Sequence, residues 1–165
     1  MSFENFEKAL ELAKICDGYW IAGGKTDEVI QRGEELMGFK FSKQTHEFFK
    51  RIGKLMLFGE VIYGISKNDF SGMPAHNSIE FTLLERKEWK LPKEWLAIYN
   101  FDDGYRGFLD YGNLNADGEP PVVMAICNGK EYVMVERVAE DLGDFILELV
   151  EEQLKYQTDK ETKEE

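Results

Sequence analysis

The segment formed by residues 91–123 limits the fold more strongly than any other part of the sequence. It contains two short, aromatic-rich runs, residues 95–99 and Tyr105–Asp110, each with turn-forming residues at both ends. Such runs are typical of β-strands. Asp103-Gly104 stands between them, and glycine accepts the positive φ that a tight turn requires. The sequence therefore predicts an antiparallel hairpin on which the flanking elements have to pack.

Helices are predicted on both sides of this hairpin, because apolar residues recur there at three- and four-residue spacing. Capping residues indicate where these helices begin and end. The predicted helices run from Ser2 to about Asp17, from Thr26 to Gly38, from Ser42 to Ile52, over Ser78–Trp89, and from Asp141 to about Tyr156. Residues 157–165 have no apolar side chain to anchor them, so we expect a disordered acidic tail.

Further strands are predicted before and after the hairpin. Residues 56–65 read as a strand or a strand pair bent at Gly59 and Gly64. Val122–Cys127 and residues 132–138 flank Asn128-Gly129, which is a type I′ turn signal. The order of elements predicts an α+β fold, with a mainly antiparallel sheet of about four to six strands and helices packed at one face and at the termini. The length favours a single domain over residues 1–156.

The charge balance limits the class of partner. The chain has 20 basic and 32 acidic residues, a net charge of -12, so phosphates would be repelled and nucleic acid is excluded as a direct ligand. A basic partner is compatible with this charge. The two distant cysteines form no CxxC motif, which suits a reducing cytoplasm. No apolar run approaches the length of a membrane span, and the first residues lack the order of a signal peptide. We therefore expect a cytoplasmic protein that does not enter the membrane.

Three features of the sequence suggest a nucleotide- or metal-binding site, and each lacks a residue that such a site requires. Gly24-Lys25-Thr26 ends like a phosphate-binding loop, but Tyr19 stands where that motif needs glycine. Residues 113–118 match the first positions of a calcium loop, but Met124 replaces its bidentate glutamate. Two histidines cannot build a His-rich metal site. The sequence therefore indicates no metal and no cofactor.

Acidic residues gather around the hairpin. They are Asp102, Asp103, Asp110, Asp117 and Glu119. Two carboxyl groups in different environments can divide acid and base roles, so a carboxylate-dependent hydrolase is one alternative. Carboxylates in such turns usually bond to the backbone of the turn itself, and no nucleophile–base pair can be nominated. The sequence therefore favours a protein that is not an enzyme.

Short motifs follow one another in a fixed order over most of the chain. They are Gly23-Gly24, Glu34, Met37-Gly38, Phe41-Ser42, Thr45, Phe48-Phe49, Ile62-Tyr63-Gly64, Leu91-Pro92, residues 95–99, Asp102-Asp103-Gly104, Asp110, residues 118–122 and residues 141–145. This order resembles the SUKH superfamily, bacterial immunity proteins that also include a fungal cell-wall regulator of the Smi/Knr type. Ser42 and Thr45 depart from the proline and tyrosine of the family pattern.

The resemblance implies a protein that binds and neutralises a cognate toxin by stoichiometric inhibition, without catalysis. Toxin domains that attack nucleic acid need basic surfaces, so a basic nuclease-type domain fits an acidic inhibitor. The alternative that the resemblance implies is a non-catalytic regulatory or scaffold interaction domain of the cell-wall-regulator type.

Partner-binding residues are predicted where aromatic side chains stand in or beside turns and close to acidic residues. Aromatic residues anchor protein interfaces, and charges supply speed and selectivity. The predicted contact residues are Tyr19, Trp20, Asp102, Asp103, Tyr105, Asp110 and Tyr111. Strand alternation also predicts that Trp95 and Tyr99 share one face of their strand.

Overall fold

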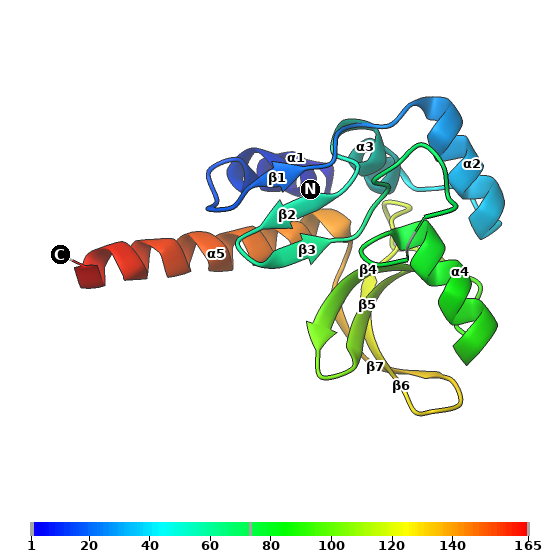
Figure 1. Ribbon diagram of the computed structural model, residues 1–165. Coiled ribbons are helices and arrows are strands. Elements are labelled where there is room, and N and C mark those ends of the chain that lie inside the picture. Colours follow the sequence, from blue (N-terminus) through cyan, green and yellow to red (C-terminus); the bar gives the residue numbers. More distant parts are fainter. Residues whose placement is uncertain (1, 73, 165) are drawn as a thin grey trace.

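The computed structural model describes residues 2–72 and 74–164. Within these ranges, five helices and seven strands in two antiparallel sheets form the α+β fold that the sequence predicts (Figure 1). The helices are α1 (Ser2–Ala13), α2 (Asp27–Met37), α3 (Lys43–Arg51), α4 (Ser78–Trp89) and α5 (Leu142–Glu164). The strands are β1 (Trp20–Ile21), β2 (Leu55–Leu57), β3 (Glu60–Ile62), β4 (Trp95–Asp102), β5 (Tyr105–Asp110), β6 (Val122–Cys127) and β7 (Tyr132–Ala139).

Three predicted helix caps are confirmed. The Thr26 hydroxyl accepts a hydrogen bond from the Val29 N–H (3.3 Å), and the Ser42 hydroxyl accepts one from the Thr45 N–H (3.4 Å). The Asp141 carboxylate accepts one from the Asp144 N–H (2.9 Å). These caps satisfy N–H groups that the first turn of a helix leaves without a partner.

The larger sheet, with strand order β4-β5-β6-β7, consists of the two predicted hairpins. The turn between β4 and β5 has positive φ at Asp102 (77°), Asp103 (53°) and Gly104 (87°). Aspartate and glycine are among the residues that tolerate this region. The turn between β6 and β7 has Gly129 at a φ of 90°. Gly104 and Gly129 therefore mark the two turns as predicted. The predicted type I′ turn is not formed, because Asn128 is not among the described residues with a positive φ and four residues separate β6 from β7.

Helices cover both faces of the larger sheet. On one face, Leu96, Leu109 and Val122 are buried in the main core, which also contains the apolar sides of α1 and α5. On the other face, Trp95 and Phe108 belong to a second buried cluster. Phe81 of α4 packs against this second cluster. The sequence predicted helices at one face of the sheet, and α4 covers the other face as well. Helical spacing shows which side of a helix is apolar, but it does not show which surface that side packs against.

An irregularity in β4 corrects the predicted alternation of its side chains. The pairing of β4 with β5 shifts between Ala97 and Tyr99, as a β-bulge produces. Tyr99 consequently lies in the main core with Leu96, whereas Trp95 lies in the second cluster. The prediction that Trp95 and Tyr99 share one face was wrong, because alternation holds only along a regular strand.

The smaller sheet, β1-β2-β3, contains the strand pair predicted over residues 56–65, which turns at Gly59. β1 was not predicted, because two residues are too few to show the alternation of a strand. The Tyr63 N–H donates to the Ile98 carbonyl of β4 (2.8 Å) and so joins the two sheets.

Glycines let backbone segments meet where the smaller sheet joins α3. A Cβ on Gly64 would lie 1.7 Å from the carbonyl oxygen of Gly53, and one on Gly24 would lie 2.0 Å from that of Lys50. Neither position can hold a side chain without moving the backbone. This contact gives a structural reason for two of the sequence motifs, Gly23-Gly24 and Ile62-Tyr63-Gly64.

The last helix is longer than the sequence suggested. α5 continues to Glu164 and projects past the body of the molecule (Figure 1), where a disordered tail over residues 157–165 was expected; Glu165 lies outside the described residues. The segment contains no glycine or proline and is rich in lysine and glutamate, which have good helix propensity. The Gln157 side chain attaches the start of this segment to the turn that follows α1: its Oε1 accepts from the Asp17 N–H (2.7 Å), and its Nε2 donates to the Ile15 carbonyl (3.5 Å).

Candidate functional site

An apolar row crosses the outer face of the smaller sheet. Trp20 pairs with Met56, and Met56 pairs with Val61, so these three residues stand side by side on successive strands. The neighbouring row contains Leu55 and Ile62, which are buried in the main core. Because successive side chains point to opposite faces of a sheet, Trp20, Met56 and Val61 face away from that core, and Val61 packs against the second buried cluster. We call these three residues the outer row.

Trp20 is the most exposed member of the outer row. Half of its surface (50%) is open to solvent, and the ammonium group of Lys54 lies 5.5 Å from its ring centroid. Phe58, at the tip of the hairpin between β2 and β3, is also about half exposed. A large aromatic side chain held on a strand and left open has the form of an interface anchor.

An acidic turn lies beside the outer row. The turn consists of Asp102, Asp103 and Gly104, all exposed. The Asn100 side chain accepts a hydrogen bond from the Asp102 N–H (3.0 Å) and holds the turn from within. Both carboxylates are therefore displayed on a backbone that is fixed before any partner arrives.

A cleft of about 120 Å³ connects the outer row to the acidic turn. Its lining includes Val61 from the outer row, Asp102 from the acidic turn, and Glu60 and Asn100. The Tyr99 hydroxyl donates to the Glu60 carboxylate. Burial, and then this bond, raises the pKa of Tyr99, so the phenol stays protonated and continues to donate.

His76 closes one side of this cleft. Its ring lies against Tyr63, with the ring centroids 5.5 Å apart. Burial, together with the charge of Lys54, lowers the pKa of His76 from its ordinary value of 6.5. The imidazole is therefore neutral at pH 7, and the charges next to the cleft are mainly those of its carboxylates.

The structure separates the predicted contact residues into surface and interior. Trp20, Asp102 and Asp103 are exposed, and Tyr19 and Tyr105 are partly buried. Tyr105 ends the acidic turn and begins β5, whereas Tyr19 packs against the main core. Trp20 and the two aspartates are therefore the predicted residues whose side chains remain exposed.

Asp110 is not available to a partner, contrary to the prediction. Its side chain is buried, with 6% exposed, and its two carboxylate oxygens accept from the Gly112 N–H (2.9 Å) and the Asn113 amide (2.8 Å). The carboxylate serves the turn that follows β5, as carboxylates beside glycine commonly do.

Tyr111 also has an internal role. Its hydroxyl accepts from the Ser42 N–H (3.2 Å) and donates to the Thr45 hydroxyl (2.8 Å), while its ring stacks on Phe39 at 4.4 Å. Burial raises the pKa of Tyr111 to about 12. The side chain fastens the start of α3 to the end of β5, so its polar end is not part of an open surface.

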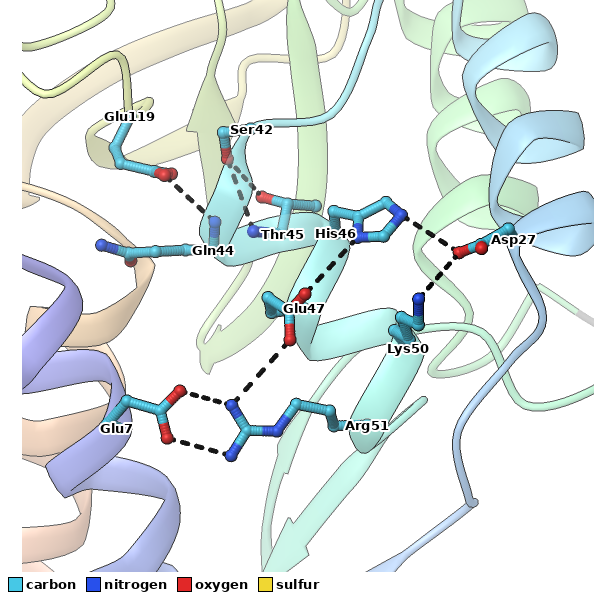
Figure 2. Close-up of polar contacts among 10 residues, drawn as sticks. All are labelled: Glu7, Asp27, Ser42, Gln44, Thr45, His46, Glu47, Lys50, Arg51 and Glu119. Carbon is cyan, nitrogen blue, oxygen red and sulfur yellow. Dashed lines mark hydrogen bonds and ion pairs between the residues drawn. The ribbon is translucent and has the colours of Figure 1, made fainter.

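Polar contacts tie α3 to the elements around it (Figure 2). The Glu119 carboxylate accepts from the Gln44 N–H (3.0 Å), and the Gln44 side chain accepts from the Gly143 N–H (2.7 Å). Arg51 forms a two-point ion pair with Glu7, in which one nitrogen–oxygen distance is 3.0 Å. α3 is thus linked to α1, to α5 and to the loop before β6.

The sequence reasoning missed Met56, Val61 and Glu60. The strands that contain them were predicted, but Met56 and Val61 stand between residues that are also apolar apart from Glu60, so the sequence did not show which of the two faces is buried. The signal that separates them is the pairing of Met56 with exposed Trp20, which is a tertiary fact. Within residues 2–72 and 74–164, the structure holds no group of three or more His, Cys, Asp or Glu side chains arranged to bind a metal ion.

Among the described residues, no helix is both long and apolar enough to span a membrane. The model of the SMI1 / KNR4 family (SUKH-1) matches residues 24–148, which is well over half of the chain. The comparison with curated proteins finds no match. The matched range begins at Gly24, in the glycine contact with α3, and it includes β2, β3, the cleft and the acidic turn.

Proposed function

The chain belongs to the SMI1 / KNR4 family (SUKH-1), and from this we propose that it is an immunity protein that binds a cognate bacterial toxin and neutralises it by stoichiometric inhibition. The toxin we propose is a basic, nuclease-type domain, and the site of action is the cytoplasm. The protein needs no catalytic step for this, since occupying the toxin surface is sufficient.

One observation supports this proposal above the others: the outer row lies directly beside the acidic turn. Val61 and Asp102 line the same cleft, so the β3 end of the outer row adjoins the acidic turn. Interfaces of stable complexes combine an apolar centre with a polar rim. The net charge of -12 raises the rate at which a basic partner arrives, and the apolar centre slows its departure.

Growth rescue tests the proposal directly. The probe is the toxin domain encoded by the gene next to that of this chain, produced in a sensitive host with and without the chain. We expect the chain to restore growth and to form a one-to-one complex with the purified domain. Absence of rescue from every toxin encoded nearby, together with absence of a complex, would overturn the proposal.

The same experiment separates inhibition by binding from the two alternatives. A carboxylate-dependent enzyme would lose rescue completely when Asp102 and Asp103 are both changed to Asn. A binder would keep rescue when it is supplied in excess over the toxin, because it loses only affinity. A regulatory domain of the same family would form no complex with the toxin and would bind several proteins of its own cell.

A further inference from the structure

A second groove lies on the other side of the acidic turn. Its volume is about 530 Å³, and it runs between the end of α4 and the tips of the two hairpins. Glu85 and Trp89 line it from α4, Asp103 and Arg106 line it from the first hairpin, and Cys127 and Tyr132 line it from the second. The volume is within the range of sites that hold ligands or side chains.

The groove exists because α4 is too short to cover the whole face of the sheet. Phe81, in the first half of α4, packs on the second buried cluster. Near the other end, Trp89 is 38% exposed, and Lys90, at a φ of 55°, ends the helix. Beyond this point Gly104 and Gly129, at the tips of the two hairpins, line the groove together with Ile126.

Polar groups at the bottom of the groove are fixed by the fold. The Tyr132 hydroxyl donates to the Glu85 carboxylate, and burial, followed by this bond, raises the pKa of Tyr132. The Arg106 guanidinium lies 5.2 Å from the ring centroid of Phe81 and donates to the Tyr63 hydroxyl (3.4 Å). A guanidinium has five N–H donors, so Arg106 retains donors for the carbonyl groups of an incoming backbone.

The rims of the groove leave room for a chain to enter. Gly104 and Gly129 stand at the two hairpin tips and present no side chain. A Cβ added to Gly129 would meet nothing within 4 Å. Asp103 is exposed on the rim next to Gly104, which supplies a negative charge at the entrance.

We propose that this groove binds an extended segment of the same basic partner, one large apolar side chain lying against Trp89 and a neighbouring lysine or arginine meeting Asp103. The inference deepens the proposed function. Asp102 lines the cleft beside the outer row, and Asp103 lines the groove, so the acidic turn is shared by two adjoining contact surfaces. The partner therefore holds the turn from both sides.

A test of the groove does not require the toxin. The probe is a library of random heptapeptides displayed on phage and selected against the full chain. We expect enriched peptides that carry a large apolar residue next to lysine or arginine. A synthetic copy should bind the Trp89→Ala variant about tenfold more weakly than the original chain, whereas Trp20→Ala, the matched exposed tryptophan outside the groove, should bind it equally well.

Alkylation of Cys127 gives a second readout that does not depend on any variant. Cys127 lines the groove and is half-buried, whereas Cys16 is buried in the main core. Bound peptide should slow the reaction of iodoacetamide with Cys127 several-fold and leave Cys16 unaffected. No enriched peptide, equal affinity for Trp89→Ala, or unchanged alkylation of Cys127 would each overturn the groove proposal.

The toxin domain then separates the two proposals. If the toxin is neutralised but its affinity is unchanged in Trp89→Ala, the groove proposal fails and the proposed function stands. If peptides bind the groove but no toxin is neutralised, the proposed function fails and the groove remains a peptide site.

Discussion

Asp102 and Asp110 belong to the same hairpin, yet their carboxylates have opposite environments. Asp102 is exposed in a turn. Its backbone N–H donates to the Asn100 side chain, whereas no hydrogen bond among the described residues holds its carboxylate. Asp110 is buried, and both of its carboxylate oxygens accept hydrogen bonds from the loop that follows. The first carboxylate remains free for a partner, whereas the second stabilises the fold. The carboxylates of this hairpin therefore have two different roles, one at the surface and one inside the fold.

Removing Asp110 should produce the largest loss of stability. Asp110→Ala deletes two hydrogen bonds to a buried charged acceptor and leaves their donors without it, so the free energy of unfolding should fall by about 3 kcal/mol. Urea denaturation followed by far-UV circular dichroism measures this change. Asp103→Asn is the control on the exposed turn, because asparagine tolerates the positive φ of this position, and it should change the same quantity by less than about 0.5 kcal/mol. Equal losses in the two variants would contradict the division into buried and exposed carboxylates.

Glu119 should have a smaller effect, and one that depends on pH. Its side chain is buried, and burial is the main cause that raises its pKa above 4.5, with the charge of Asp141 acting in the same direction. A raised pKa in the folded state means that its contribution to stability is complete below pH 4.5 and is lost as pH rises through the folded-state pKa.

Glu119→Gln is therefore expected to remove this loss while its amide oxygen still accepts from the Gln44 N–H. The variant should be at least as stable as the original chain at pH 8, and the difference should shrink as the pH approaches 4.5. Thermal unfolding from pH 4 to pH 8 gives this comparison. A difference that grows toward low pH would show that the Glu119 carboxylate is stabilised by its surroundings, which is the reverse of this account.

The acidic turn should contribute least to stability and most to the rate of association. Asp102→Asn and Asp103→Asn keep residues that tolerate a positive φ, so each should change the free energy of unfolding by less than about 0.5 kcal/mol. Association with the toxin domain should slow, and its dependence on salt should weaken, because screened charges supply the attraction. Stopped-flow measurements at low and high salt test both effects, and unchanged rates would remove the acidic turn from the interface.

The sequence predicted both hairpins because Gly104 and Gly129 mark turns that need a positive φ, which few residues other than glycine adopt. It could not distinguish Asp102 from Asp110, since both stand within a few residues of glycine and only the loop after β5 buries one of them. Tyr111 was misjudged for a related reason, because its partners Ser42 and Thr45 are distant in sequence. The outer row could not be predicted from the sequence. The pairing of β1, β2 and β3 decides which of their apolar residues face away from the core, and the local sequence pattern does not show this pairing.

The affinity of the toxin domain for Trp20→Ala tests the central claim, that the outer row is the contact surface. Trp20 is half exposed, so its removal should change the free energy of unfolding by less than about 1 kcal/mol. As an interface anchor, its loss should weaken binding by about 30-fold, equivalent to about 2 kcal/mol. Leu114→Ala removes another exposed large apolar side chain, from the loop after β5, and should bind like the original chain. If calorimetry shows that Trp20→Ala and Leu114→Ala bind the toxin domain equally well, the outer row is not the contact surface.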